Sequence, residues 1–114
     1  MKISVAQIHP VPGNPTQTIE KVAELSRQTA REGSRLIAFP ECLLTGGSFD
    51  SREDLERGAI DIDALAPLLA VSTQTGIYII TGFYERRPDA IFNTAALIGP
   101  EGIVGLHRKR HLPF

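Results

Sequence analysis

Cysteine and tryptophan are nearly missing from this chain of 114 residues, which has one cysteine, Cys42, and no tryptophan. A single cysteine excludes an internal disulfide and so excludes the small secreted scaffolds that disulfides hold together. An excess of one charge is also lacking, because the formal net charge is −1. Such a chain, taken as a whole, offers no electrostatic basis for binding nucleic acid or a membrane surface.

Long hydrophobic runs are absent from the sequence as well. No run approaches the roughly 20 apolar residues of a membrane-spanning helix. The apolar stretch at the N-terminus is too short for a signal peptide, because Gln7 and His9 interrupt it. We therefore expect a cytoplasmic protein with neither a nucleic acid nor a membrane as its partner.

What is present is the composition of a globular domain. Hydrophobic residues make up 42% of the chain and charged residues 22%, an ordinary balance. The length suits one small domain. The sequence ends Leu112-Pro113-Phe114, whereas a domain usually ends in a polar, frayed tail. We therefore expect residues 1–114 to be the N-terminal part of something longer.

Helix signals occur in three places along the chain. Asn14 can cap a helix, Pro15 suits the first turn of that helix, and Gly33 is placed to end it in a left-handed conformation. Ser51 begins a Ser-x-x-Asp capping pattern that opens a short helix. An amphipathic pattern over residues 62–76 predicts another helix.

Apolar runs predict five strands. The run 3–8 is apolar on both faces and predicts a buried strand, and the run 36–39 predicts a central strand. Turn residues separate the runs 77–84, 91–98 and 103–107, which predict a meander. The order of helices and strands indicates a layered α/β fold. We disfavour a doubly wound nucleotide-binding fold, because no Gly-x-Gly-x-x-Gly follows the first strand.

Glu41 is the first candidate for a catalytic residue. It follows an apolar strand directly, behind Pro40, which ends the ladder of hydrogen bonds because proline has no N–H. A carboxylate held at the end of a central strand can serve as a general base. A glutamate that caps a helix or lies in a surface loop is the simpler alternative, since Phe-Pro-Glu is a short motif.

Lys109 is the second candidate and lies in the basic run 107–111. This run can be a solvated turn, or a nucleic-acid patch that no other basic stretch supports. The apolar sequel 112–114 favours instead an inward lysine next to Glu41, where its charge would stabilise an oxyanion. A structural ion pair with Glu41 is a further alternative.

These motifs together resemble the nitrilase superfamily, the carbon–nitrogen hydrolases. The start of the chain resembles that family's first strand, and residues 33–41 resemble its segment G-A-x-L-x-x-F-P-E. Residues 82–85 and 92–95 match further landmarks, and residues 105–112 resemble its lysine segment. The resemblance covers essentially the whole chain in order.

The resemblance implies roles for single residues. Glu41 matches the family's general base, Lys109 its catalytic lysine, and Glu85 the glutamate of a G-x-x-E landmark that supports the site. The family's nucleophilic cysteine lies in a later segment resembling I-C-Y-D, and nothing in this sequence matches it. Adjacent residues of an extended segment point in opposite directions, so Cys42 should not face the same pocket as Glu41. We therefore expect Cys42 to be a packed residue.

The resemblance also implies a fold and a reaction. The fold class is α/β, the N-terminal part of a nitrilase-like α-β-β-α sandwich. Residues 1–114 would be a partial carbon–nitrogen hydrolase domain that lacks the downstream nucleophile segment and is inactive in isolation. The complete enzyme would be a homo-oligomer that hydrolyses a non-peptide carbon–nitrogen bond in a small-molecule amide, nitrile or carbamoyl substrate, through a cysteine thioester. No cofactor or metal is implied.

Two alternative functions stay open. One is the glutaminase domain of an amide-transferring synthetase. The other is a non-catalytic fragment that binds a partner through an uncovered apolar face of its sheet, a hypothesis motivated by the missing nucleophile.

Overall fold

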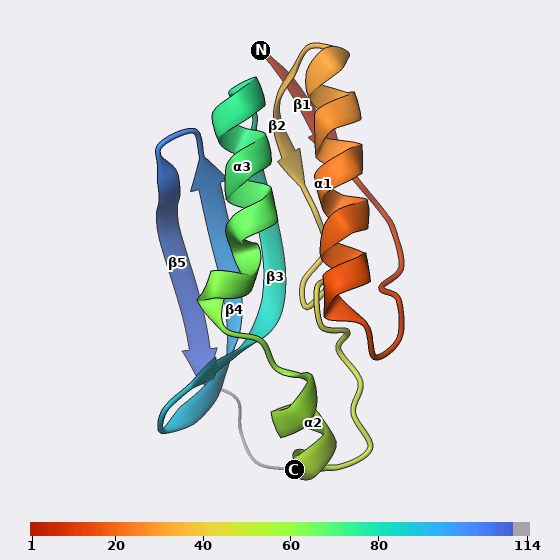
Figure 1. Cartoon of the computed structure of the whole chain (residues 1–114), viewed down its shortest axis with the longest axis vertical. Helices are drawn as coiled ribbons and strands as arrows, with labels where there is room; N and C mark the ends of the chain where they lie inside the picture. Colours follow the sequence, from red (N-terminus) through yellow and green to blue (C-terminus); the bar gives the residue numbers. More distant parts are fainter. Residues whose placement is uncertain (111–114) are drawn as a thin grey trace.

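A computed structural model describes residues 1–110 as one mixed sheet with helices packed on it (Figure 1). The sheet has the order β1-β2-β3-β4-β5. The strands are β1 (Lys2–Val5), β2 (Ser34–Ala38), β3 (Tyr78–Arg87), β4 (Ala90–Gly99) and β5 (Gly102–Arg110). The helices are α1 (Pro15–Arg31), α2 (Arg52–Gly58) and α3 (Ala66–Thr75), and the 3-10 turn η1 (Ile62–Leu65) precedes α3.

The capping residues form the helix ends that the sequence predicts. The Asn14 side chain accepts a hydrogen bond from the backbone N–H of Gln17, and Pro15 begins α1. Ser51 accepts likewise from Asp54 at the start of α2. The sequence does not reveal the division of its last helix into η1 and α3.

The pairing of the last three strands follows the predicted meander. β1, β2 and β3 run parallel to one another, and β3, β4 and β5 form an antiparallel meander. Gly99 and Gly102 pair at the β4–β5 turn. The layered α/β arrangement predicted from the sequence is therefore confirmed.

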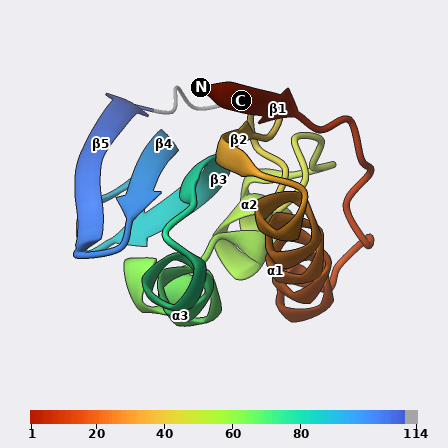
Figure 2. The same ribbon diagram turned by 90° about the horizontal axis from the view of Figure 1, so that it is seen from above.

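The helices α1 and α3 cover one face of the sheet, as Figure 2 shows. The core between helices and sheet is built from buried side chains of α1, α3 and the inner strands, such as Val22, Leu68, Ile79, Phe83 and Ile98. Successive residues of a strand point to opposite faces of the sheet. The residues that alternate with these core residues along each strand therefore lie on the other face. In the described part of the chain, neither α1 nor α3 packs on that other face (Figure 2).

We call this uncovered surface the open face. Register places on it these apolar side chains of β1 to β4: Ile3, Val5, Leu36, Ala38, Ile80, Ala95 and Leu97.

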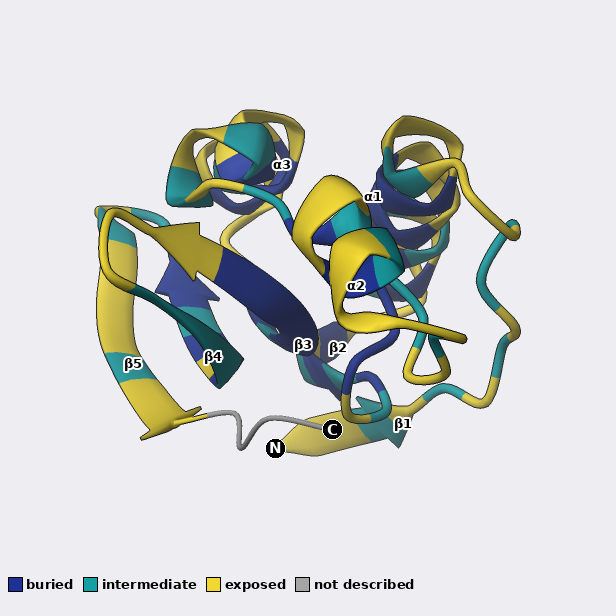
Figure 3. Ribbon diagram, turned by 90° about the horizontal axis from the view of Figure 1, so that it is seen from below, coloured by how far each residue is buried: buried dark blue, intermediate teal, exposed yellow. Residues whose placement is uncertain are grey.

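The expectation of a buried first strand is wrong in this chain. β1 lies at an edge of the sheet, and Ile3 and Val5 are 55% and 77% exposed. Figure 3 shows β1 and β5 largely exposed and much of β3 buried. An apolar pattern reports what a strand is suited to pack against, but nothing among residues 1–110 covers Ile3 and Val5 of β1. The inward packing expected of residues 112–114 lies outside the described residues. Among the described residues, no helix is long and apolar enough to cross a membrane.

Candidate active site

Glu41 lies on the open face, in the segment that follows β2. This segment runs beside β3 and hydrogen-bonds to it: the Phe39 N–H donates to the Ile80 carbonyl at 2.9 Å, and the Leu44 N–H donates to the Gly82 carbonyl at 3.1 Å. The Tyr84 N–H then donates to the Thr45 hydroxyl at 3.0 Å. The loop after β2 is thereby fixed along β3.

Gly82 makes this close approach possible. A Cβ atom at position 82 would lie 2.7 Å from the Cys42 nitrogen and 3.1 Å from the Glu41 Cα. Real Cβ atoms essentially never come so close to backbone. Only glycine therefore lets β3 lie directly against the backbone that carries Glu41.

Asn93 forms hydrogen bonds with both Glu41 and Cys42. Its Nδ2 donates to Glu41 Oε1, and its Oδ1 accepts from Cys42 Sγ at 3.6 Å. Cys42 has a φ of 59°, in the left-handed region, and residues 41–45 form turns. The assumption of an extended segment was therefore wrong, and two adjacent side chains reach the same amide.

Cys42 is nevertheless a packed residue, as expected. It is 8% exposed and clusters with Leu55, Ala59 and Tyr84. Burial raises the pKa of the Cys42 thiol, a hydrogen bond with Tyr84 opposes this rise, and the negative charge of Glu41 adds to it. The side chain is consequently held as a thiol, whereas a nucleophile requires thiolate.

Lys109 lies on the open face beside Asn93. The two residues are cross-strand partners in β4 and β5, so their side chains share a face. Glu41, Asn93, His107 and Lys109 line one depression of about 360 Å³. Glu41 and Lys109 are both exposed, and within residues 1–110 neither belongs to an ion pair within 4.0 Å.

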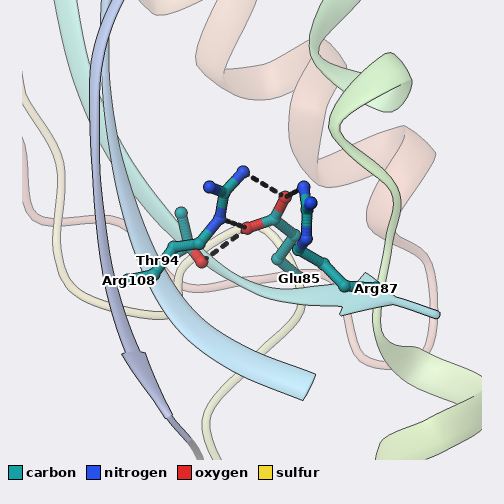
Figure 4. Close-up of polar contacts among 4 residues, drawn as sticks. All are labelled: Glu85, Arg87, Thr94 and Arg108. Atoms are coloured by element: carbon teal, nitrogen blue, oxygen red, sulfur yellow. Dashed lines mark hydrogen bonds and ion pairs between the residues drawn. The ribbon is translucent and has the colours of Figure 1, made fainter. Parts of the chain in front are cut away.

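Glu85 lies on the opposite, helix-covered face of the sheet. It is 1% exposed and accepts hydrogen bonds from Arg108 Nε at 2.7 Å, Arg108 Nη2 at 3.0 Å and Thr94 Oγ1 at 2.9 Å (Figure 4). Arg87 Nη1 lies 3.7 Å from Glu85 Oε2. These contacts link three strands, since the partners come from β3, β4 and β5.

The charge of Glu85 is stabilised by its partners. Burial acts to raise the pKa of this carboxyl group, but hydrogen bonds from Arg108 and Thr94 and the charges of Arg108 and Arg87 outweigh burial. The net pKa of Glu85 is lowered. The hydrogen bond to Glu85 in turn raises the pKa of Arg108, with burial opposing and the carboxylate charge adding.

The structure thus brings two of the three predicted site residues to one depression and separates the third. Glu41 and Lys109 share the open face, and Glu85 lies behind it. Thr94 and Arg108, which bind Glu85, immediately adjoin Asn93 and Lys109 in sequence. Sequence reasoning noted Asn93 only within a landmark. A polar residue inside the apolar run 91–98 is the signal that marks it.

The arrangement offers acid–base chemistry and a cation on one surface. Within residues 1–110, no group of three or more His, Cys, Asp or Glu side chains is placed to hold a metal ion. The chemically useful groups of the depression are the carboxylate of Glu41, the amide of Asn93 and the ammonium of Lys109.

Comparison with known proteins identifies the family. The family model for carbon-nitrogen hydrolases matches residues 2–113. A nitrilase from Pyrococcus abyssi is 31% identical over 115 aligned residues, which cover 98% of this chain and 44% of the relative. XC1258 from Xanthomonas campestris, a carbon–nitrogen hydrolase superfamily protein, superposes with a TM-score of 0.79 at 24% identity, over 96% of this chain and 40% of that structure.

An amidase from Nesterenkonia sp. superposes with a TM-score of 0.75 at 18% identity, over 98% of this chain and 43% of that structure. The chain therefore spans less than half the length of these relatives. The likenesses confirm the fold class, the N-terminal part of a nitrilase-like α-β-β-α sandwich. With its family match and its nitrilase relative, the chain belongs to the carbon–nitrogen hydrolases of the nitrilase superfamily.

Proposed function

We propose that the protein carrying this chain hydrolyses a non-peptide carbon–nitrogen bond in a small amide, nitrile or carbamoyl compound. The proposal gives Glu41 the role of general base and Lys109 the role of oxyanion-stabilising cation. One observation carries it: Glu41 and Lys109 are 68 positions apart in the sequence and yet line the same depression. Asn93 is hydrogen-bonded to Glu41 and is the cross-strand partner of Lys109.

The chemistry requires a thiol as nucleophile. In the family that this sequence resembles, a cysteine in a later segment supplies it, and we propose the same source here. Cys42 is unsuited, because it is packed in a cluster and its thiol pKa is raised, first by burial. A buried thiol that resists ionisation is inert toward an amide carbon.

The reaction would run in two halves. Glu41 takes the proton of the attacking thiol, and the sulfur bonds to the carbon of the amide. The oxygen of the resulting tetrahedral intermediate gains a negative charge, which the Lys109 ammonium stabilises. Glu41 returns the proton to the leaving amine, the carbon–nitrogen bond breaks, and a thioester remains.

Hydrolysis of the thioester would complete the cycle. Glu41 removes a proton from water, and the hydroxide oxygen bonds to the thioester carbon while the carbon–sulfur bond breaks. The thiolate recovers its proton from Glu41 and the free acid leaves. For a nitrile, the developing negative charge lies on nitrogen, and a second water is consumed before the acid is released. The same carboxylate serves as base and acid in both halves.

Glu85 would support the site from behind the sheet and would not touch the substrate. Its bonds to Thr94 and Arg108 fix the alignment of β3, β4 and β5. The neighbours of those two residues, Asn93 and Lys109, are then held side by side on the open face. Assembly into a homo-oligomer and residence in the cytoplasm belong to the same proposal.

Ammonia release tests the reaction class. The protein expressed from its complete coding sequence is incubated with a small aliphatic nitrile, a short ω-amide, an N-carbamoyl amino acid and glutamine. Release of ammonia from one or more of the first three supports the proposal. Release from glutamine alone points to a glutaminase domain. Absence of release from every compound contradicts the proposal and favours a protein that acts by binding a partner.

A further inference from the structure

Asn93 lies on the open face between the two proposed catalytic groups. It belongs to β4, opposite Tyr84 of β3 and opposite Lys109 of β5. Its side chain is half-buried, whereas those of Glu41 and Lys109 are exposed. An exposed glutamate side chain has many accessible rotamers, so any fixed orientation of Glu41 must come from a specific partner. Among residues 1–110, the side-chain partner of Glu41 is Asn93.

The two ends of the Asn93 amide meet partners of opposite kinds. The NH₂ end faces the carboxylate of Glu41, which can only accept, and the carbonyl end faces the thiol of Cys42, which can donate. Turning the amide over would place its oxygen against a carboxylate oxygen, with no hydrogen between them, and would lose the contact with Glu41. Glu41 therefore fixes the orientation of Asn93, and this orientation presents the amide carbonyl to the Cys42 thiol.

The environment of Cys42 favours its protonated thiol, which donates a hydrogen bond to Asn93. Burial raises the pKa of Cys42, and the charge of Glu41 adds to that rise against the opposing hydrogen bond with Tyr84. Cys42 itself is held in a turn with a φ of 59°, on backbone that Gly82 allows to lie directly on β3. The chain of contacts from thiol to amide to carboxylate thus starts from a rigid part of the molecule.

We propose that Asn93 is a positioning residue, whose amide, oriented by the Cys42 thiol, holds the Glu41 carboxylate over the depression that it shares with Lys109. The inference rests on the proposed function, in which Glu41 is the base. It also gives Cys42 a task other than nucleophilic attack, and explains why two adjacent residues after β2 turn toward one amide.

The test compares wild type with Asn93→Ala in the protein expressed from its complete coding sequence. The kcat for a hydrolysed amide or nitrile should fall about 100-fold, the scale on which misplacement of a catalytic group costs activity, while KM changes little. Asn93→Gln keeps a side-chain amide and should recover part of the lost kcat, which a residue that only fills space would not require.

A measurement that requires no turnover separates this inference from the proposed function. Carboxyl-selective NMR reports the resonance of the Glu41 side chain, which is assigned by its absence from Glu41→Gln. The chemical shift of this resonance should change in Asn93→Ala, because the carboxylate loses the hydrogen bond from the amide. An unchanged resonance would overturn the inference even if the protein hydrolysed no carbon–nitrogen bond.

Matched variants complete the design. Cys42→Ser keeps a donor and should retain most of the activity. Cys42→Ala loses the donor and should lower kcat with little change in KM, as Asn93→Ala does. Gln74→Ala removes an exposed side-chain amide on α3 and should change nothing. A fall in kcat for Asn93→Ala with an unchanged Glu41 resonance would show a merely structural role. If Asn93→Ala does not fold, equal activities of the two Cys42 variants would overturn the inference.

Discussion

Lys109 is the residue at which catalysis and folding can be separated most cleanly. Its side chain is exposed on β5, and within the described residues it takes part in no ion pair. Removing its charge therefore costs the folded state little. The same exposure leaves the ammonium free to meet a substrate placed in the depression.

For Lys109→Met we predict a fall in kcat of about 10²- to 10³-fold, the effect of removing one oxyanion donor, with an unchanged melting temperature. Steady-state ammonia release and thermal unfolding measure the two quantities. Lys21→Met is the matched control, because Lys21 lies on α1 and donates to the His9 carbonyl at the surface. A variant that turns over at the wild-type rate would contradict the proposed role. A variant that loses stability but keeps kcat would indicate a structural charge.

Gly82 is a residue at which the backbone itself decides the outcome. For Gly82→Ala we predict a loss of about 1–3 kcal/mol in the free energy of unfolding, the usual range for overpacking. The new methyl group would press on the Cys42 nitrogen and displace Glu41, so kcat should fall as well. Urea unfolding and ammonia release are the measurements. Gly105→Ala is the control, because a Cβ there meets nothing within 4 Å.

At the scale of elements, the meander of β3, β4 and β5 is tied together by Glu85. The carboxylate is buried, and its partners come from its own strand, from the adjacent β4 and from β5 beyond it. The site residues on the other face depend on this alignment, since Asn93 and Lys109 are a cross-strand pair.

We predict that Glu85→Gln lowers the free energy of unfolding at neutral pH by about 1–3 kcal/mol, because charge-assisted hydrogen bonds are lost. The pKa of Glu85 is lower in the folded state than its unfolded value of about 4.3. Its contribution to stability is thus fully present above that unfolded value, and is lost as the pH falls through the folded pKa.

Urea unfolding of wild type and Glu85→Gln over a range from neutral to acidic pH measures this dependence. The difference between the two proteins should shrink on acidification. A difference that stays constant or grows would mean that the carboxylate charge is not what stabilises the meander. Glu101→Gln, an exposed glutamate at the β4–β5 turn, is the control.

Local signals in the sequence predicted the elements well, and predicted their surroundings less well. Asn14 and Ser51 form helix caps because a cap depends on residues three positions away. The burial of the first strand depended on a covering layer, which a local pattern cannot supply. The orientation of Cys42 depended on a left-handed turn at a non-glycine residue, for which a sequence carries no reliable sign. Glu41 and Lys109 were found by motif, but the Asn93 bridge between them required the register of β4.

The whole molecule is a sheet with one face packed and one face open. Figure 2 shows the helices α1 and α3 together on one side, and the open face carries both the apolar side chains of β1 to β4 and the candidate site. Water-exposed apolar surface of this kind favours association. Within residues 1–110, β1 and β5 are edge strands, and their outer backbone groups have no strand partner.

We predict that a chain of residues 1–114 binds the dye anilinonaphthalene sulfonate, and that the double variant Ile3→Lys, Val5→Lys binds less of it. The reason is that Ile3 and Val5 are 55% and 77% exposed on the open face. Fluorescence titration measures the binding. Gln74→Lys on α3 controls for added charge. Equal dye binding by the double variant and wild type would contradict an accessible apolar face.

The central claim is that Glu41 acts as the base in cleavage of a carbon–nitrogen bond. The most direct measurement is the rate of ammonia release by wild type and Glu41→Gln, both expressed from the complete coding sequence, with the best substrate of the panel. Loss of a general base should lower the rate by about 10²- to 10⁴-fold, while the exposed side chain leaves unfolding unchanged. Equal rates for the two proteins would contradict the claim.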